Sequence, residues 1–162
     1  MNCKMKSIIA AFTGAVVGGV LGTCIAGRIE GEVTTKAELM SEKHLALFQL
    51  MNKWVNIKQE GKNISNYLQT NNYNTIAIYG MSYVGETLIN ELKGSSIKIV
   101  CGIDQKAERI YSEIEVVSLD KNIPPVDAVI VTAITYFDEI EEKLSKKVSC
   151  PIISLEDILY DL

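Results

Sequence analysis

Several residue patterns that mark enzymes and metal proteins are missing from this chain. The four cysteines, Cys3, Cys24, Cys101 and Cys150, form no CxxC pair, so the spacing of a zinc site is absent. None of the seven tyrosines is followed four residues later by lysine, the pair that passes protons in short-chain reductases and epimerases. There is also no GxSxG elbow, no HExxH, and no glycine-rich loop ending in Lys-Ser or Lys-Thr. We therefore predict no catalytic or metal-binding residue, and we do not expect an enzyme that acts by itself.

Basic charge is scarce in the C-terminal part of the chain. Residues 71–162 hold eight Lys/Arg and fifteen Asp/Glu, a net charge of about −7, and they contain no basic patch. Such a surface repels a phosphate backbone, which argues against nucleic acid as a partner. The one histidine, His44, lies outside the predicted binding edge and is interpreted as a surface or packing residue. Cys101 lies inside a predicted strand and Cys150 opens another, so we expect both to be free, buried thiols, which are typical of a reducing compartment.

Charge is missing altogether from residues 7–27. These 21 positions are enough, at about 1.5 Å per residue, to cross a hydrocarbon core of about 30 Å. Small residues recur at every fourth position, which places them on one stripe: Ala10, Gly14, Gly18, Gly22 and Ala26. The segment predicts a single transmembrane helix whose stripe allows close approach of a second copy or of a partner helix in the membrane.

Two other interpretations of the N-terminus stay open. Lys4 and Lys6 before an apolar run that ends at Cys24 resemble a lipoprotein signal, and a cleaved secretory signal is the other alternative. Basic residues on both sides of the segment leave its orientation open. We expect a cell-membrane protein with its soluble domain in the cytoplasm, where a nucleotide ligand and unpaired cysteines fit best.

Residues 28–70 form a predicted helical connector. Apolar residues recur at helical spacing from about residue 36 to residue 60, and Gly61 is a suitable C-terminal stop. The stripe either packs on the domain that follows or forms a short coiled coil; its members are Met40, Leu47, Leu50, Trp54 and Ile57. A second, short helix is predicted over residues 64–70.

A strand, a glycine turn and a helix follow in direct succession. Residues 75–79 (TIAIY) predict a strand, residues 80–85 (GMSYVG) a turn, and the residues through 92 a helix. Gly80 allows the tight turn, Gly85 allows close packing of the helix, and Ser82 replaces the middle glycine of GxGxxG. Ser82 is expected to cap the helix and to help hold one phosphate. The next strand, residues 97–103, ends in Asp104, where a ribose hydroxyl is expected.

The rest of the chain repeats this alternation. Strands are predicted over residues 115–118, 127–133 and 151–154, and helices over residues 137–147 and 155–162, the last begun by Ser154. The predicted fold class is therefore α/β, a Rossmann-like parallel sheet of about five strands in residues 71–162, preceded by a transmembrane helix and an amphipathic helix. Ligands of such sheets bind at the carboxyl ends of the strands. The predicted cofactor-binding residues at that edge are Gly80, Ser82, Gly85, Asp104, Thr132 and Ala133.

These runs resemble a group of known domains. IAIYGMSYVGETLINEL, IVCGIDQKAERIYSEIEVVSLDK and PPVDAVIVTA are similar to the small Rossmann domains of bacterial polysaccharide-biosynthesis proteins, including those of sugar O-acetyltransferases and membrane-bound nucleotide-sugar dehydratases. The resemblance spans about residues 73–155. It implies Gly80, Ser82 and Gly85 as a phosphate loop, Asp104 as a ribose or sugar contact, and a nucleotide or nucleotide-sugar as ligand. The acetyltransferase repeats and the dehydratase catalytic half have no counterpart in this sequence.

Three hypotheses remain from the sequence. The first is a membrane-tethered module that binds NAD(P) or a nucleotide-sugar, with a link to surface-polysaccharide biosynthesis. The second is a ligand-free scaffold that oligomerises through its N-terminal helices. The third is an enzyme, alone or completed by a partner subunit.

Overall fold

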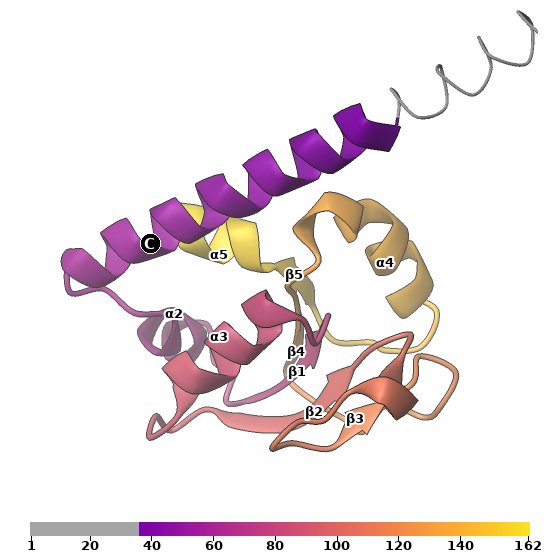
Figure 1. The fold of residues 1–162 in the computed structure, drawn as a ribbon. Helices are drawn as coiled ribbons and strands as arrows, with labels where there is room; N and C mark the ends of the chain where they lie inside the picture. Colours follow the sequence, from indigo (N-terminus) through magenta and orange to yellow (C-terminus); the bar gives the residue numbers. More distant parts are fainter. Residues whose placement is uncertain (1–35) are drawn as a thin grey trace, which may run out of the picture. The chain divides into compact units, whose positions relative to one another are not determined.

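The structure is a computed structural model that describes residues 36–162 (Figure 1). The chain divides into two compact units, residues 1–45 and residues 46–162. Helix 36–59 crosses this boundary, and its C-terminal part belongs to the second unit. The predicted transmembrane segment, residues 7–27, lies outside the described residues. Among residues 36–162, no helix combines the length and the hydropathy needed to span a membrane.

The second unit is a mixed α/β structure built on a five-stranded parallel sheet. The strands stand in the order β3-β2-β1-β4-β5, so the connections run to opposite sides of β1. The elements after helix 36–59 are α2 (Ile64–Thr70), β1 (Thr75–Tyr79), α3 (Tyr83–Leu92), β2 (Lys98–Ile103), η1 (Ala107–Arg109), β3 (Val116–Val117), β4 (Ala128–Val131), η2 (Ile134–Tyr136), α4 (Phe137–Leu144), β5 (Ile152–Ser154) and α5 (Leu155–Asp161).

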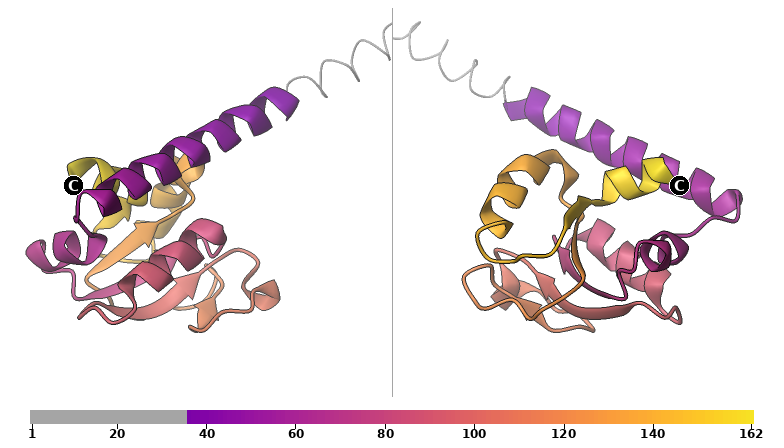
Figure 2. Two further views of the ribbon diagram at one scale, coloured as in Figure 1. Left: turned by 60° about the vertical axis from the view of Figure 1, so that its left-hand side comes forward. Right: turned by 180° about the vertical axis from the view of Figure 1, so that it is seen from behind.

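Alternate residues of the strands enter two separate cores. One core joins a face of the sheet to α2, α3 and α5, and the other joins the opposite face to α4. In β1, Ile76 and Ile78 belong to the first core, whereas Ala77 and Tyr79 belong to the second. Figure 1 shows α2, α3 and α5 together on one side of the sheet with α4 apart from them, and the view from behind in Figure 2 agrees. Both faces are covered, as expected for apolar parallel strands.

The first core also includes the last turns of helix 36–59. Leu50, Trp54 and Ile57 are 1%, 3% and 1% exposed and pack in the cluster that contains α2, α3 and α5. Complete burial of such side chains stabilises a fold by roughly 1.5–3 kcal/mol each. This part of the apolar stripe therefore packs on the domain, which is the first of the two alternatives left open by the sequence. Met40, on the same predicted stripe, is 47% exposed.

The ends of several helices show the expected local chemistry. Helix 36–59 is followed by Gly61 at φ +76°, and the Lys62 amide donates to the Ile57 carbonyl, which satisfies the last turn. Ser154 caps α5 by accepting a hydrogen bond from the Glu156 amide at 3.2 Å. Several predicted elements are shorter than expected, and β3, for example, covers only Val116–Val117 of the predicted residues 115–118. Strand β4 ends at Val131, before Thr132 and Ala133, and α4 ends at Leu144 after the separate turn η2.

Burial keeps the two cysteines of the described residues as protonated thiols. Cys101 is buried in β2 and Cys150 is partly buried, and both are free. Burial raises the pKa of each thiol above its ordinary value. Protonated thiols are poor nucleophiles, so packing is the role that the structure supports for them.

Asp127 gives the fold a pH-dependent contribution. Its carboxylate accepts hydrogen bonds from the Thr75 amide at 2.7 Å, the Thr75 hydroxyl at 2.8 Å and the Asn74 amide at 3.0 Å. These bonds, those from Thr75 first, hold the pKa of the Asp127 carboxyl below its ordinary value of 3.8. Because the folded-state pKa is depressed, the stabilisation is present above about pH 3.8 and is lost as the pH falls through the folded-state pKa.

We expect Asp127→Asn to lower the melting temperature at neutral pH, and the deficit to shrink as the pH falls below about 3.8. Thermal unfolding followed by circular dichroism across this range measures both effects. Asp120→Asn is the matched control, because the exposed Asp120 carboxylate accepts no hydrogen bond from residues 36–162. A deficit of the same size at every pH would contradict the assigned role.

Candidate functional site

The turn after β1 can be made only with glycine at position 80. Gly80 has φ +96°, and a Cβ there would lie 2.7 Å from the Thr132 hydroxyl oxygen and 3.3 Å from the Ala133 nitrogen. Its amide donates to the Ile103 carbonyl at 2.9 Å, which continues the β1–β2 ladder into the turn. Conformation and space therefore both exclude a side chain at this position.

Gly85 lets α3 start directly against this turn. A Cβ at position 85 would lie 2.3 Å from the Gly80 carbonyl oxygen, far inside van der Waals contact. Val84 and Leu88 are buried on the same helix and hold it on the sheet. The sequence assigned Gly85 this packing function, and the contact explains it.

The first turn of α3 leaves amide groups without protein acceptors. Within the described residues, the amides of Tyr83, Val84 and Gly85 donate to no backbone or side-chain acceptor, and the first helical bond runs from Glu86 to the Ser82 carbonyl. Ser82 stands at the N-cap position with extended backbone, but its side chain makes no capping hydrogen bond. The expected cap is therefore wrong in this respect. The exposed Ser82 hydroxyl lies beside a helix end that carries positive partial charge.

Asp104 is tied to the same turn from the neighbouring strand. One carboxylate oxygen accepts the Met81 amide at 3.0 Å and the other accepts the Lys106 amide at 2.8 Å. The residue is only partly buried. A carboxylate has about four acceptor positions, so Asp104 retains capacity for a hydroxyl ligand after these two bonds.

Thr132, directly after β4, is bonded to the backbone of the turn. It is 2% exposed, and its hydroxyl donates toward the Gly80 carbonyl at 2.6 Å and the Tyr79 carbonyl at 3.1 Å. Its amide also donates to the Tyr79 carbonyl at 2.9 Å. The hydroxyl is committed to the backbone of the turn, so Thr132 shapes the candidate site, while the partly buried Ala133 continues from it into η2.

Two residues that the sequence did not single out complete the arrangement. The Met81 side chain is 5% exposed and packs over Gly102 in β2, where a Cβ would lie 2.6 Å from the Met81 sulfur. Met81 thus joins the turn to β2 through its side chain as well as through its amide. The only sequence signal was a glycine inside an otherwise apolar strand, which is typical of close approach by another group.

All six predicted residues therefore lie at one edge of the sheet. Gly80 follows β1, Asp104 follows β2, and Thr132 follows β4, so the turn stands between strands whose connections diverge. Glu86, in the first turn of α3, and Asp104 bring negative charge here, whereas Lys106 and Arg109 bring positive charge on the following segment. Because these side chains are of mixed sign, the bare amides are the most distinct anion-binding feature.

Two shallow cavities lie near this edge. One of about 250 Å³ is formed by residues 134–139 after β4, and one of about 300 Å³ lies between α3 and residues 111–113. None of the six predicted residues lines either cavity. Within residues 36–162, no group of three His, Cys, Asp or Glu side chains is arranged to hold a metal ion.

A family model described as C2185-like, N-terminal matches residues 71–151, which is half of the chain and runs from the turn before β1 to the start of β5. No curated protein and no solved structure matches the chain.

The contact between Gly85 and Gly80 can be tested by stability. We expect Gly85→Ala to destabilise the protein by roughly 1–3 kcal/mol, because the added methyl group must displace α3 from the Gly80 carbonyl. The midpoint of urea unfolding measures this loss. Asn90→Ala, at an exposed position of the same helix, is the control and should be neutral or slightly stabilising. Equal midpoints for Gly85→Ala and the native chain would show that the helix is not held this closely.

Proposed function

The chain belongs to the C2185-like, N-terminal family, and from that starting point we propose that it is a membrane-tethered, Rossmann-like module that binds a nucleotide or nucleotide-sugar. The phosphate of the ligand binds at the first turn of α3. The observation that carries this proposal is the set of unpaired amides of Tyr83, Val84 and Gly85 at the carboxyl edge of a parallel sheet. Anions bind such helix ends through backbone N–H groups and the helix dipole.

The strand order supports the same location. The connection from β1 leads to β2 on one side, whereas the connection from the neighbouring β4 leads to β5 on the other side. Ligands of open parallel sheets bind where the strand order reverses in this way. Gly80 and the start of α3 lie at this point. Asp104, on the neighbouring connection, is close enough to share a hydrogen bond with Met81 and is proposed to accept a ribose or sugar hydroxyl.

Ser82 modifies the kind of phosphate contact. Its Cβ occupies the place where the second glycine of GxGxxG allows a pyrophosphate to approach the backbone. The free hydroxyl instead supplies a side-chain donor beside the amides. This arrangement favours a single phosphate held by amides and hydroxyl, in NAD(P) or in a nucleotide-sugar, over a pyrophosphate lying flat on the loop.

A ligand-free scaffold is the second candidate function. Both Asp104 oxygens and the Thr132 hydroxyl already have partners within the protein, and Met81 fills the space over Gly102. These contacts would stabilise the turn even if no ligand ever bound there. The scaffold would oligomerise through the N-terminal helices.

The remaining parts of the proposal rest on the sequence. The tether is the apolar segment of residues 7–27, with the domain in the cytoplasm and a second copy or a membrane partner on the small-residue stripe. The resemblance to polysaccharide-biosynthesis domains suggests the biological setting. No reaction is proposed.

Ser82→Glu tests the binding proposal without disturbing the core. The exposed carboxylate should occupy the free amides of α3 and repel phosphate, while favouring the helix through its dipole. We expect the dissociation constant of whichever of NAD⁺, NADP⁺ and UDP-glucose binds the native chain to rise about tenfold or more, ~1.4 kcal/mol. Equilibrium dialysis with the full chain, in a detergent without sugar or phosphate groups, measures it.

Ser82→Ala is the matched control, because it removes the hydroxyl and keeps the amides, so binding should weaken only a few fold, roughly 1 kcal/mol. Gly80→Val is unsuitable, since the clash with Thr132 would damage the fold itself. Binding to none of the three ligands, or equal binding by Ser82→Glu and the native chain, would refute the proposed site and leave the scaffold.

A further inference from the structure

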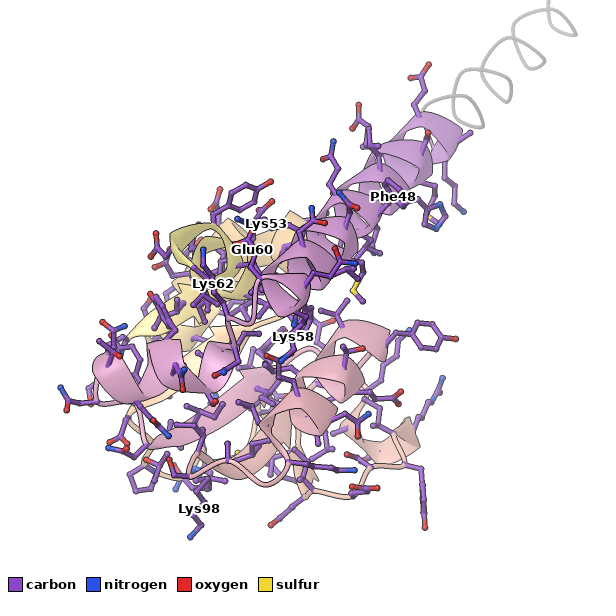
Figure 3. The ribbon with its side chains drawn as sticks, turned by 90° about the vertical axis from the view of Figure 1, so that its left-hand side faces the viewer. Phe48, Lys53, Lys58, Glu60, Lys62 and Lys98 are labelled. Atoms are coloured by element: carbon purple, nitrogen blue, oxygen red, sulfur yellow. The ribbon has the colours of Figure 1, made fainter. Side chains whose placement is uncertain are left out.

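Glu91 is an almost buried carboxylate that the proposed binding site does not use. Its side chain is 8% exposed, and it accepts three hydrogen bonds from two other segments. The Trp54 indole donates at 2.7 Å and the Lys58 ammonium at 3.1 Å, both from helix 36–59. The amide of Ile64, the first residue of α2, donates at 3.2 Å. Figure 3 shows Lys58 on the part of helix 36–59 that lies next to α3.

These bonds connect α3 to the corner between helix 36–59 and α2. Near the C-terminal end of α3, the helix dipole disfavours a negative charge. Glu91 is instead stabilised by Lys58 and by the N-terminal amide of α2. A buried charge that loses its partners is strongly destabilising, so its bonds restrict how α3 can move relative to residues 54–64.

The same helix carries the proposed phosphate site at its other end. Glu91 lies eight residues after Tyr83, about 12 Å along a rigid helix. Val84, Leu88 and Glu91 follow one another at helical spacing, and the two apolar residues are buried along the first core. A small rotation or shift of α3 at its first turn is therefore carried to the Glu91 carboxylate.

Glycine turns bound α3 at both ends. Gly80 precedes it at φ +96° and Gly94 follows it at φ +79°. Glu91 forms hydrogen bonds to helix 36–59 through Trp54 and Lys58. In the sequence, this helix follows residues 1–35 and precedes the rest of the domain.

We propose that Glu91 couples occupancy of the α3 N-terminus to the position of the C-terminal turns of helix 36–59. The inference rests on the proposed nucleotide-binding function and describes its regulation. A ligand that binds at the first turn of α3 shifts the helix and thereby changes the hydrogen bonds of Glu91 to Trp54 and Lys58. Coupling is reciprocal, so displacement of the C-terminal turns of helix 36–59 changes the ligand affinity by the same factor by which the ligand changes the equilibrium of that displacement.

Trp54 makes this coupling measurable, because it is the one tryptophan of the chain and its indole binds Glu91. With the full chain in a detergent without sugar or phosphate groups, saturating NAD⁺ or UDP-glucose should change the Trp54 emission. Glu91→Gln, which keeps the shape and removes the charge, should abolish this change and weaken binding at least threefold in equilibrium dialysis.

Glu142→Gln is the matched control, because Glu142 lies on α4 and forms an exposed ion pair with Lys146 beyond the end of that helix. It should alter neither the emission change nor the affinity. Ligand binding of equal affinity in the native chain and Glu91→Gln, with unchanged Trp54 emission, overturns the coupling while leaving the proposed function in place.

If no nucleotide binds, the proposed function fails, and hydrogen exchange then tests separately whether Glu91 holds α3 to the C-terminal turns of helix 36–59, the link on which the coupling depends. Glu91→Gln should accelerate exchange of the amides of residues 86–88 more than of those in β4. Ile57→Val weakens the same core without touching Glu91 and should accelerate both regions alike. Matching exchange profiles for the two variants overturn the coupling.

Discussion

The close approach of α3 to the end of β1 is the constraint on which the rest of the structure depends. The Gly80 carbonyl receives the Thr132 hydroxyl from one side and faces the backbone of Gly85 on the other. Side chains at positions 80 and 85 would separate these groups. Because both are absent, the helix begins at the sheet edge, with its first amides at the point where the strand order reverses. The core of α3 and the candidate site are thus consequences of one contact.

The same contact distinguishes residues that shape the turn from residues that are proposed to contact a ligand. Thr132 and Met81 are turned inward and hold the turn against β4 and β2. Ser82 is exposed, and its hydroxyl makes no capping hydrogen bond. Asp104 holds the turn by accepting the Met81 amide, and it also keeps free acceptor positions. Most polar side chains at this edge form hydrogen bonds to backbone groups of the protein. The groups that remain for the proposed ligand are the α3 amides, the Ser82 hydroxyl and the free acceptor positions of Asp104.

Local signals were sufficient to predict most elements. Both α2 and β1 have their predicted bounds, because each apolar run is limited by residues that stop it: Asn63 caps α2, and Gly80 ends β1. Gly80 and Gly85 were also recognisable from spacing alone. Contacts between residues that are distant in the sequence could not be predicted. The packing of Met81 on Gly102 and the hydrogen bond between Glu91 and Trp54 leave no local sequence pattern. Thr132 was found by position, but the direction of its hydroxyl depends on the turn it meets.

Mapping of backbone amides by NMR tests the central claim most directly. In a titration of the full chain with UDP-glucose and, separately, NAD⁺, the account predicts that the binding ligand shifts the amides of Ser82, Tyr83, Val84 and Gly85 most, with smaller shifts at Met81 and Lys106 through Asp104. Shifts confined to other surfaces, or no shifts with either ligand, would contradict the assignment of the α3 N-terminus as the binding site.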